Sequence, residues 1–501
     1  MTVLQYLENT AGLFPDKPAV IDENGVYTFS ELRGKALSIA ALIKDRLKGV
    51  LNQPILVYMP KDKLSIAACI GIVYSGNVYS PTDVRIPFPH VQGVIDVLNP
   101  ALIISDPENA KTLRNNGISD DAILVMDNTQ CPVFETGLAL IEAIDTDPVN
   151  VLFTSGSTGV PKGVTISHRS IIDYVDWVTD CFSVSEREII GNQSHLYFDH
   201  SILDIFLCLK TGASLHVIPE RHYTFPLRLM QYIEEHKVNF LLWVPSVLCH
   251  VADQAALEHA DLSCLRKVLF AGEVMPNKQL NYWRNQIPHA LFANLYGPTE
   301  ITVDCTYFIV DRPFADDEPL PIGFPCANTD ILLLDDNNAL VTEPDVQGEI
   351  CVRGSSLAVG YWNAPEVSKE RFCQNPLNDH YPERIYRTGD LAHYNDRGEL
   401  MFDGRKDHQI KHMGYRIELG EIEAAAQGYE GVQRAACIYD ESESKIILFF
   451  TGSGAAAEIT AHLRKILPRY MVPRVILPVA DMPMTATGKI DRKQLRASME
   501  R

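Results

Sequence analysis

The sequence contains no hydrophobic stretch of the roughly 20 residues that a membrane-spanning helix requires. Its eleven cysteines include no C-x-x-C pair, which argues against structural zinc sites and against a disulfide framework. The N-terminus has no basic segment, and Glu8 lies where a secretion signal would be apolar. These absences favour a protein that works in a reducing cytoplasm.

Positive charge is also scarce, because 64 Asp and Glu residues face 44 Lys and Arg residues and give a formal net charge of −20. Such a charge disfavours nucleic acid and anionic membranes as partners. Residues 461–501 are the exception, with nine Lys and Arg against three acids. This basic segment suits an acidic partner, although an ordinary solvated helix face explains it equally well.

The length of 501 residues predicts more than one domain. Near-continuous apolar runs, typical of buried parallel strands, alternate with helical patterns. The runs are residues 55–59, 122–126, 238–244, 268–271 and 291–295, and residues 225–237 are one of the expected helices. From residue 335 onward, turn signals predict β-hairpins, and a compact α+β segment follows GRKD at residues 404–407.

We therefore expect an α/β protein with two domains. Residues 1–406 would form a large N-terminal domain of layered sheets with helices and a β-rich subdomain. Residues 407–501 would form a small, mobile α+β lid.

The most informative motif is the loop FTSGSTGVPKG at residues 153–163. Its glycines let backbone N–H groups turn toward an anion, because no Cβ stands in the way. Lys162 and four hydroxyl groups would bind phosphate oxygens. The residues concerned are Thr154, Ser155, Gly156, Ser157, Thr158, Gly159, Lys162 and Gly163.

The loop differs from a P-loop, because Pro161 precedes the lysine and Gly163 follows it, where that motif requires glycine and Ser or Thr. An apolar run precedes the loop and a helix is expected from about residue 170. We therefore expect a strand–loop–helix crossover that binds a nucleotide; the alternative is a flexible surface loop.

Five further motifs follow in order: NLYGPTE (294–300), YRTGDL (386–391), GRKDHQIKHMGYRIELGEIE (404–423), LPRYMVP (467–473) and TGKIDR (487–492). With the loop, they resemble the adenylate-forming superfamily of acyl-CoA synthetases, luciferases and nonribosomal peptide adenylation domains. The resemblance covers almost the whole chain. YGPTE and YRTGDL are similar to the amino-acid-activating branch and to its freestanding relatives, the D-alanine, L-prolyl and L-seryl carrier protein ligases.

The resemblance implies a nucleotide site. Tyr296 would stack on adenine, Thr299 would bind the α-phosphate, and Glu300 would hold Mg²⁺ together with water and phosphate oxygens. Asp390 would accept hydrogen bonds from both ribose hydroxyls, and Arg405 would reach the ribose and phosphate. The expected ATP- and AMP-binding residues are Thr154, Ser155, Gly156, Ser157, Thr158, Gly159, Lys162, Gly272, Glu273, Asn294, Tyr296, Gly297, Thr299, Asp390 and Arg405.

The resemblance also implies that Lys489 bridges the substrate carboxylate and the α-phosphate, which stabilises two anions as they meet. The lid of this family rotates between two half-reactions, here about Asp407 as the hinge. Rotation would replace Lys489 by Gly414, whose missing side chain leaves room for a phosphopantetheine arm. The residues expected to take part in catalysis are Lys489, Thr154, Lys162 and Glu300.

In FDHS, residues 198–201, the resemblance implies that Asp199 binds the α-ammonium of an amino acid. A carboxylate that requires an ammonium partner rejects plain fatty acids strongly. The alternative role of Asp199 is the N-cap of a helix. The expected substrate-binding residues are Asp199, His200, Leu203, Ser246, Leu269, Ala271, Leu295, Val303, Asp304 and Lys489.

This small, mostly aliphatic pocket resembles two patterns. Its aliphatic frame is similar to that of proline activators, whereas Leu269, Leu295 and Asp304 are similar to serine activators, in which the aspartate would accept the side-chain hydroxyl. A diamino acid, with Asp304 facing its second ammonium, is a third option. D-alanine ligases usually carry cysteine where Ala271 lies, which disfavours that substrate.

We expect an AMP-forming ligase that uses ATP and Mg²⁺ to activate a small amino acid, with serine favoured over proline, D-alanine or a diamino acid. It would load a freestanding peptidyl or acyl carrier protein in nonribosomal peptide or antibiotic biosynthesis, because the twelve residues after Lys489 are too few for a carrier domain. The remaining alternatives are an acyl- or aryl-CoA synthetase, which Asp199 disfavours, and a nucleotide-binding protein that has lost catalysis. The intact Lys162, Glu300 and Lys489 argue against that loss.

Overall fold

The computed structural model describes residues 1–127, 143–156, 160–407, 409–440, 443–484 and 490–499. The chain forms two compact units. The larger unit consists of Met1–Val84, Asn99–Leu152 and Val164–Gly404, and the smaller unit consists of Arg85–Leu98, Phe153–Gly163 and Arg405–Arg501. The glycine-rich loop thus groups with the C-terminal part of the chain. The domain boundary and the hinge expected at Asp407 stay predictions.

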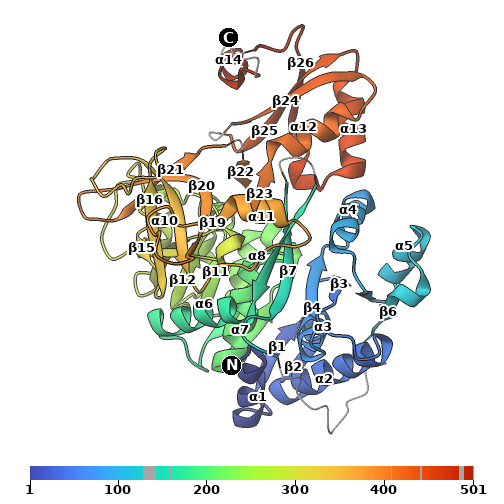
Figure 1. Ribbon diagram of the computed structural model, residues 1–501. Coiled ribbons are helices and arrows are strands. Elements are labelled where there is room, and N and C mark those ends of the chain that lie inside the picture. The colour runs from blue at the N-terminus through green and yellow to red at the C-terminus, as the bar shows by residue number, and fades with distance from the viewer. Residues whose placement is uncertain (128–142, 157–159, 408, 441–442, 485–489, 500–501) are drawn as a thin grey trace. The chain divides into compact units, whose positions relative to one another are not determined.

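A nine-stranded sheet in the larger unit has the order β15-β14-β13-β12-β11-β9-β10-β1-β2 (Figure 1). Its strands are β1 (Pro18–Asp22), β2 (Gly25–Thr28), β9 (Ile189–Asn192), β10 (Ser214–Val217), β11 (Phe240–Trp243), β12 (Lys267–Phe270), β13 (Leu291–Tyr296), β14 (Thr306–Ile309) and β15 (Phe324–Pro325). The strands from β1 to β13 in this order pair in parallel. The apolar runs predicted at residues 238–244, 268–271 and 291–295 are therefore confirmed as β11, β12 and β13.

A seven-stranded sheet has the order β18-β8-β7-β4-β3-β5-β6. Its strands are β3 (Pro54–Tyr58), β4 (Val78–Thr82), β5 (Leu102–Ser105), β6 (Ile123–Val125), β7 (Pro148–Thr154), β8 (Lys162–Ser167) and β18 (Gly360–Tyr361). Strands β3 to β6 pair in parallel, which confirms the runs predicted at residues 55–59 and 122–126.

Strand β8 corrects one prediction. The glycine-rich loop does not lead directly into a helix, because β8 follows it and lies next to β7 in the same sheet. The helix begins only after Ser167, whose hydroxyl accepts a hydrogen bond from the Ser170 N–H. The β-branched run of Val164, Thr165 and Ile166 favours an extended chain, but it is too short to distinguish from a helix start by periodicity.

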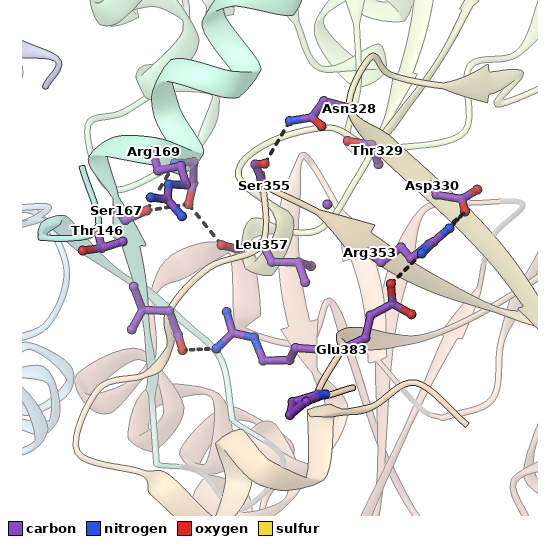
Figure 2. Close-up of a pocket in the computed structure, with 15 residues that line it drawn as sticks. Thr146, Ser167, Arg169, Asn328, Thr329, Asp330, Arg353, Ser355, Leu357 and Glu383 are labelled. Atoms are coloured by element: carbon purple, nitrogen blue, oxygen red, sulfur yellow. Dashed lines mark hydrogen bonds and ion pairs between the residues drawn. The ribbon is translucent and has the colours of Figure 1, made fainter. Parts of the chain in front are cut away.

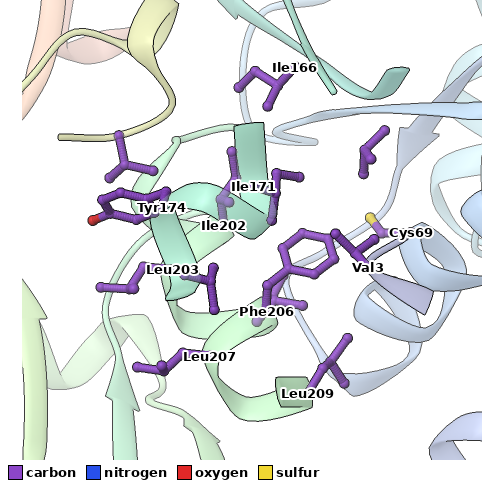
Figure 3. Packing of buried hydrophobic residues seen from close by; sticks show 14 of the residues in the cluster. Val3, Cys69, Ile166, Ile171, Tyr174, Ile202, Leu203, Phe206, Leu207 and Leu209 are labelled. Atoms are coloured by element: carbon purple, nitrogen blue, oxygen red, sulfur yellow. The ribbon is translucent and has the colours of Figure 1, made fainter. Parts of the chain in front are cut away.

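Helices surround these sheets in the larger unit. They are α1 (Leu4–Leu13), α2 (Phe29–Arg46), α3 (Lys63–Tyr74), α5 (Asn109–Asn115), α6 (His168–Cys181), α7 (His200–Thr211), α8 (Pro226–Glu235), α9 (Pro245–Asp253), α10 (Asn277–Gln286) and α11 (Pro365–Arg371). Helix α8 confirms the helix predicted at residues 225–237. Helices α6 and α7 pack on one another, and Figure 3 shows Ile171 of α6 beside Ile202 and Phe206 of α7 in the buried core.

The β-rich part predicted from residue 335 is present. Its strands are β16 (Thr329–Leu334), β17 (Gly348–Gly354), β19 (Phe372–Gln374), β20 (Arg384–Tyr394) and β21 (Leu400–Arg405), in the order β16-β17-β20-β19 with β21 beside β20. Backbone hydrogen bonds close both predicted turns, from Asn338 N to Asp335 O (3.0 Å) and from Gly398 N to Asn395 O (2.9 Å).

The smaller unit has the α+β composition predicted for the C-terminal segment. Its elements are α4 (Phe88–Leu98), β22 (Gln409–His412), β23 (Tyr415–Glu418), α12 (Leu419–Gln427), β24 (Val432–Asp440), β25 (Lys445–Gly452), α13 (Ala456–Ile466), β26 (Val475–Pro478) and α14 (Arg492–Ala497). Ile422 of α12, Leu448 of β25 and Leu463 of α13 share one hydrophobic core. Within the described parts of the whole chain, no helix is long and apolar enough to cross a membrane.

A close helix contact gives a stability prediction. A Cβ on Gly71 of α3 would lie 2.8 Å from the Ala36 carbonyl oxygen and from the Ile39 side chain, both on α2. Gly71→Ala should therefore lower the free energy of unfolding by about 1–3 kcal/mol, although alanine is the better helix former. Chemical denaturation of the full chain measures the change.

Gly12 of α1 is the matched control, because a Cβ there would meet no atom within 4 Å. Gly12→Ala should leave stability unchanged or raise it by up to about 1 kcal/mol. Equal stabilisation by both substitutions would contradict the described packing of α2 on α3.

Candidate functional site

The carboxyl edge of the nine-stranded sheet gathers many of the predicted residues. Ser246 lies in the first turn of α9, just after β11; Ala271 follows β12; and Tyr296 ends β13. Because these strands are parallel neighbours, their carboxyl ends lie at one edge, where open α/β sheets bind ligands. The fold therefore assembles predicted substrate and nucleotide residues at one place.

Asp199 lies at the N-cap position of α7, but its side chain makes no capping hydrogen bond. Its Oδ2 instead accepts a hydrogen bond from the Thr299 hydroxyl at 2.6 Å. The residue expected to bind the α-ammonium thus contacts the residue expected to bind the α-phosphate. The alternative role of Asp199, in which its carboxylate caps the helix, does not describe this structure.

Asp304 is buried at the end of a strained turn. Thr302 and Val303, which precede it, have positive φ angles of 60° and 75°, a conformation that β-branched residues rarely adopt. The turn is held tightly, because a Cβ on Gly297 would lie 2.4 Å from the Val303 oxygen and 2.5 Å from the Asp304 Cα. Only glycine fits at position 297.

Tyr296 and Asp390 are also brought together. The Tyr296 hydroxyl donates to Asp390 Oδ2 at 2.5 Å, and both side chains are buried. Burial and the neighbouring carboxylate of Asp390 hold the pKa of Tyr296 well above its usual value, so this tyrosine stays a neutral donor. The residues expected to bind adenine and ribose therefore form one hydrogen-bonded pair.

Glu300, the expected Mg²⁺ ligand, is fully buried, and its Oε1 accepts a hydrogen bond from the Tyr361 hydroxyl at 2.7 Å. Among the described residues, no three His, Cys, Asp or Glu side chains form a group able to hold a metal ion. A Mg²⁺ ion that takes one carboxylate and completes its shell with phosphate and water oxygens fits this donor set; a cage built of protein ligands in the described residues does not.

The aliphatic residues expected in the pocket are buried: Leu203, Leu269, Ala271, Leu295 and Val303. His200 is also buried, and its ring lies 3.8 Å from where a Cβ on Gly272 would be. Two of the other predicted residues have structural contacts. Glu273 accepts a hydrogen bond from the Ser246 N–H (2.9 Å), and the Asn294 amide donates to the Pro321 carbonyl (2.8 Å).

The described part of the glycine-rich loop belongs to the smaller unit. A Cβ on Gly156 would lie 1.9 Å from the Val160 oxygen, so glycine is required there. The Ser155 hydroxyl donates to the Arg416 carbonyl (2.8 Å) and accepts from the Glu418 N–H (3.0 Å). The Ser155 hydroxyl, which we expected to bind phosphate, therefore makes hydrogen bonds to β23. Its role in phosphate binding stays a prediction.

Thr154 ends β7 and Lys162 begins β8, with the Thr154 hydroxyl 3.5 Å from the Lys162 carbonyl oxygen. Also in the smaller unit, Arg405 donates to both oxygens of Asp407, at 2.6 and 2.8 Å. Gly414 has a positive φ of 79° between β22 and β23. Four predicted residues lie outside the described residues: Ser157, Thr158, Gly159 and Lys489.

A polar cavity of about 780 Å³ opens elsewhere in the larger unit, and no predicted site residue lines it (Figure 2). Arg169 pairs with Asp145 (2.9 Å), and Arg353 lies between Asp330 and Glu383. The third guanidinium of the cavity, from Arg384, donates to two backbone carbonyls. Because these cations are already engaged, the cavity is poorly suited to bind the phosphates of a nucleotide.

Sequence reasoning missed two hydroxyl donors of the site. Tyr174 of α6 donates to Asp304 Oδ2 at 2.6 Å, and Tyr361 donates to Glu300. Tyr174 occurs at helical spacing with Ile171 and Val178, a pattern typical of core residues. No local motif marked either tyrosine; only the fold brings them to the carboxylates.

Comparison with known proteins identifies the family. The model of the AMP-binding enzyme family matches residues 7–362, and that of the AMP-binding enzyme C-terminal domain matches residues 421–489. Tyrocidine synthase 1 of Brevibacillus parabrevis is 30% identical over 500 residues, which cover 99% of this chain and 45% of that protein. The chain spans less than half the length of the first curated relatives it matches.

A shorter relative is matched along nearly its whole length. The L-proline–[L-prolyl-carrier protein] ligase of Streptomyces coelicolor is 31% identical over 522 residues, which cover 99% of this chain and 96% of that protein. The solved structure of holo-PA1221, an NRPS protein containing adenylation and PCP domains bound to a vinylsulfonamide inhibitor, has a TM-score of 0.86. It is 26% identical, with 99% of this chain and 84% of that chain covered. The chain therefore belongs to the AMP-binding enzyme family, the adenylate-forming superfamily that its six motifs resemble.

Proposed function

We propose that this chain uses ATP to adenylate a small amino acid, with serine favoured, and transfers the aminoacyl group to the phosphopantetheine thiol of a carrier protein. The observation that carries this proposal is the 2.6 Å hydrogen bond between Thr299 and Asp199. It sets the group proposed for the α-phosphate beside the group proposed for the α-ammonium. An α-amino acid fits this spacing, because its ammonium and its reacting carboxylate are attached to the same carbon.

The side-chain pocket supports a substrate that is short and can donate a hydrogen bond. The leucines and the valine expected to line the pocket are buried, and so is Asp304, its predicted polar contact. A substrate hydroxyl could donate a further hydrogen bond to Asp304, beside the one from Tyr174, whereas a methyl group could not. Serine meets this requirement. L-proline, the substrate named for the Streptomyces coelicolor relative, is the alternative within the same reaction.

In the proposed first half-reaction, a carboxylate oxygen of the amino acid attacks the α-phosphorus of ATP and pyrophosphate leaves. Lys489 would stabilise the charge shared by the carboxylate and the α-phosphate. A Mg²⁺ ion at Glu300 would neutralise phosphate charge when bound. In the second half-reaction, the phosphopantetheine thiol attacks the acyl carbon, loses its proton to solvent, and AMP leaves as a thioester forms.

ATP–pyrophosphate exchange across a panel of amino acids tests the proposal. The panel contains serine, alanine, proline, D-alanine and 2,3-diaminopropionate, with a fatty acid as the negative control. We expect exchange with serine above all others and none with the fatty acid. Exchange that no amino acid stimulates would rule out the proposed function.

Asp199→Asn should weaken the binding of the amino acid far more than the binding of ATP, because only the ammonium loses a charged partner. We expect the KM for serine to rise roughly 10- to 100-fold, while the KM for ATP stays within about threefold. Steady-state exchange kinetics measure both constants. Asp176→Asn is the control, since Asp176 bonds to Tyr6 and Lys210 away from the site. Equal loss of affinity for both substrates would point to a structural role for Asp199.

Lys489→Ala should lower adenylation at least about 100-fold, because it removes a cation that stabilises the transition state. Transfer from supplied seryl-adenylate to a carrier protein should stay near the wild-type rate. Exchange measures the first step and mass spectrometry of the loaded carrier measures the second. Lys493→Ala, an exposed lysine of α14, is the control. A similar loss in both steps would contradict separate use of Lys489.

Asp304→Ala tests the choice between serine and proline. If Asp304 accepts the serine hydroxyl, the variant should lose roughly 10- to 100-fold in kcat/KM for serine while tolerating or gaining proline and alanine. Exchange kinetics with all three amino acids give the ratios. Unchanged activity with serine, or a wild-type protein that exchanges only with proline, would refute serine as the substrate.

A further inference from the structure

Tyr174, which is outside the predicted pocket set, contacts a residue of that set through its hydroxyl group. It lies on α6, is 2% exposed, and its hydroxyl donates to Asp304 Oδ2 at 2.6 Å. Figure 3 shows its ring beside Leu203, with the hydroxyl directed out of the aliphatic cluster. The ring also packs on Trp177 of the same helix, with centroids 5.7 Å apart.

The partner of this hydroxyl is held just as firmly. Asp304 follows the two positive-φ residues Thr302 and Val303, and its Cα leaves no room for a side chain on Gly297. The Thr302 hydroxyl donates to the Ser356 carbonyl at 2.7 Å, which anchors the turn. Local strain of this kind persists only where the surrounding structure enforces it, and it is concentrated at functional sites.

The direction of the hydrogen bond between Tyr174 and Asp304 is also fixed. Burial and the charges of Asp304 and Asp199 hold the pKa of Tyr174 well above its usual value. The phenol therefore keeps its proton and is the donor of the 2.6 Å hydrogen bond to Asp304.

We propose that Tyr174 is a specificity-determining positioning residue, which fixes the Asp304 carboxylate so that it selects amino acids whose short side chain ends in a hydrogen-bond donor. This inference rests on the proposed function and deepens it. A carboxylate on a rotatable bond discriminates poorly, whereas one held by a rigid phenol presents its charge in one direction. The hydroxyl of serine would donate a hydrogen bond to the carboxylate in this orientation, whereas alanine and proline have no side-chain donor.

Tyr174→Phe tests the inference, because it keeps the ring that packs on Trp177 and removes only the hydroxyl. We expect kcat/KM for serine to fall roughly 10- to 100-fold, with that for alanine within about threefold, so that the serine-to-alanine ratio falls at least about threefold. ATP–pyrophosphate exchange measures both values. If Tyr174 has a purely structural role, kcat/KM should fall equally for serine and alanine. An unchanged serine-to-alanine ratio would therefore overturn the inference.

Tyr6→Phe is the matched control. The Tyr6 hydroxyl also donates to an aspartate carboxylate on α6, Asp176, at 2.9 Å, yet it lies outside the site. The control removes the same kind of hydrogen bond from the same helix, so it should leave the serine-to-alanine ratio at the wild-type value. A matching fall in the ratio in both variants would attribute the effect to α6 as a whole and would refute a specific role for Tyr174.

A double-mutant cycle isolates the pair. In the Asp304→Ala background, Tyr174→Phe should change kcat/KM for serine by less than about threefold, because its partner is already absent. If Tyr174→Phe alone proves unstable, the double variant should be the more stable of the two, since neither the phenol nor the carboxylate is then left buried without the other. A further tenfold loss in the double variant would refute the inference.

The outcomes separate the two proposals. A wild-type protein that shows no exchange with any amino acid overturns the proposed function itself. A wild-type protein that exchanges with serine, together with a Tyr174→Phe variant of unchanged serine-to-alanine ratio, overturns only the role of Tyr174. A wild-type preference for proline over serine overturns the donor requirement while leaving amino acid adenylation intact.

Discussion

The turn from Gly297 to Asp304 is the constraint on which the candidate site of the larger unit depends. Its backbone packs so closely that only glycine fits at one end, and two β-branched residues adopt positive φ angles at the other. Such conformations cost about 1–3 kcal/mol each and are retained where the fold requires them. Three residues of this turn make hydrogen bonds to other parts of the site: Thr299 to Asp199, Glu300 to Tyr361 and Asp304 to Tyr174. A change in the backbone conformation of this turn would therefore disturb all three hydrogen bonds at once.

Four of the carboxylates predicted in this site make the same kind of contact. Each accepts a hydrogen bond from a neutral hydroxyl group at 2.5 to 2.7 Å: Asp199 from Thr299, Glu300 from Tyr361, Asp304 from Tyr174 and Asp390 from Tyr296. A hydroxyl group orients a carboxylate without cancelling its charge, as Lys or Arg would do. This arrangement suits groups that are to meet an ammonium, a divalent cation or sugar hydroxyls.

Much of the fold and part of the site could be predicted from the sequence, and the reasons are physical. Buried parallel strands such as β11 and β12 are continuous apolar runs, and motifs such as NLYGPTE carry local chemistry that a reader of the sequence can recognise. Contacts between distant segments could not be predicted. Tyr174 and Asp304 are 130 positions apart, and Tyr174 has the spacing of a core residue. The hydrogen bonds of Ser155 to β23 join segments more than 260 positions apart, and β8 was too short to distinguish from the start of a helix.

The central claim is that one pocket binds the α-ammonium at Asp199 and a side-chain donor at Asp304. A crystal structure of the protein with the non-hydrolysable analogue 5′-O-(L-seryl)sulfamoyladenosine tests it most directly. The account predicts the seryl ammonium within hydrogen-bonding distance of the Asp199 carboxylate, and the seryl hydroxyl on the Asp304 carboxylate with Tyr174 still bound to it. An ammonium that contacts neither oxygen of Asp199, or a seryl hydroxyl directed away from Asp304, would contradict the account.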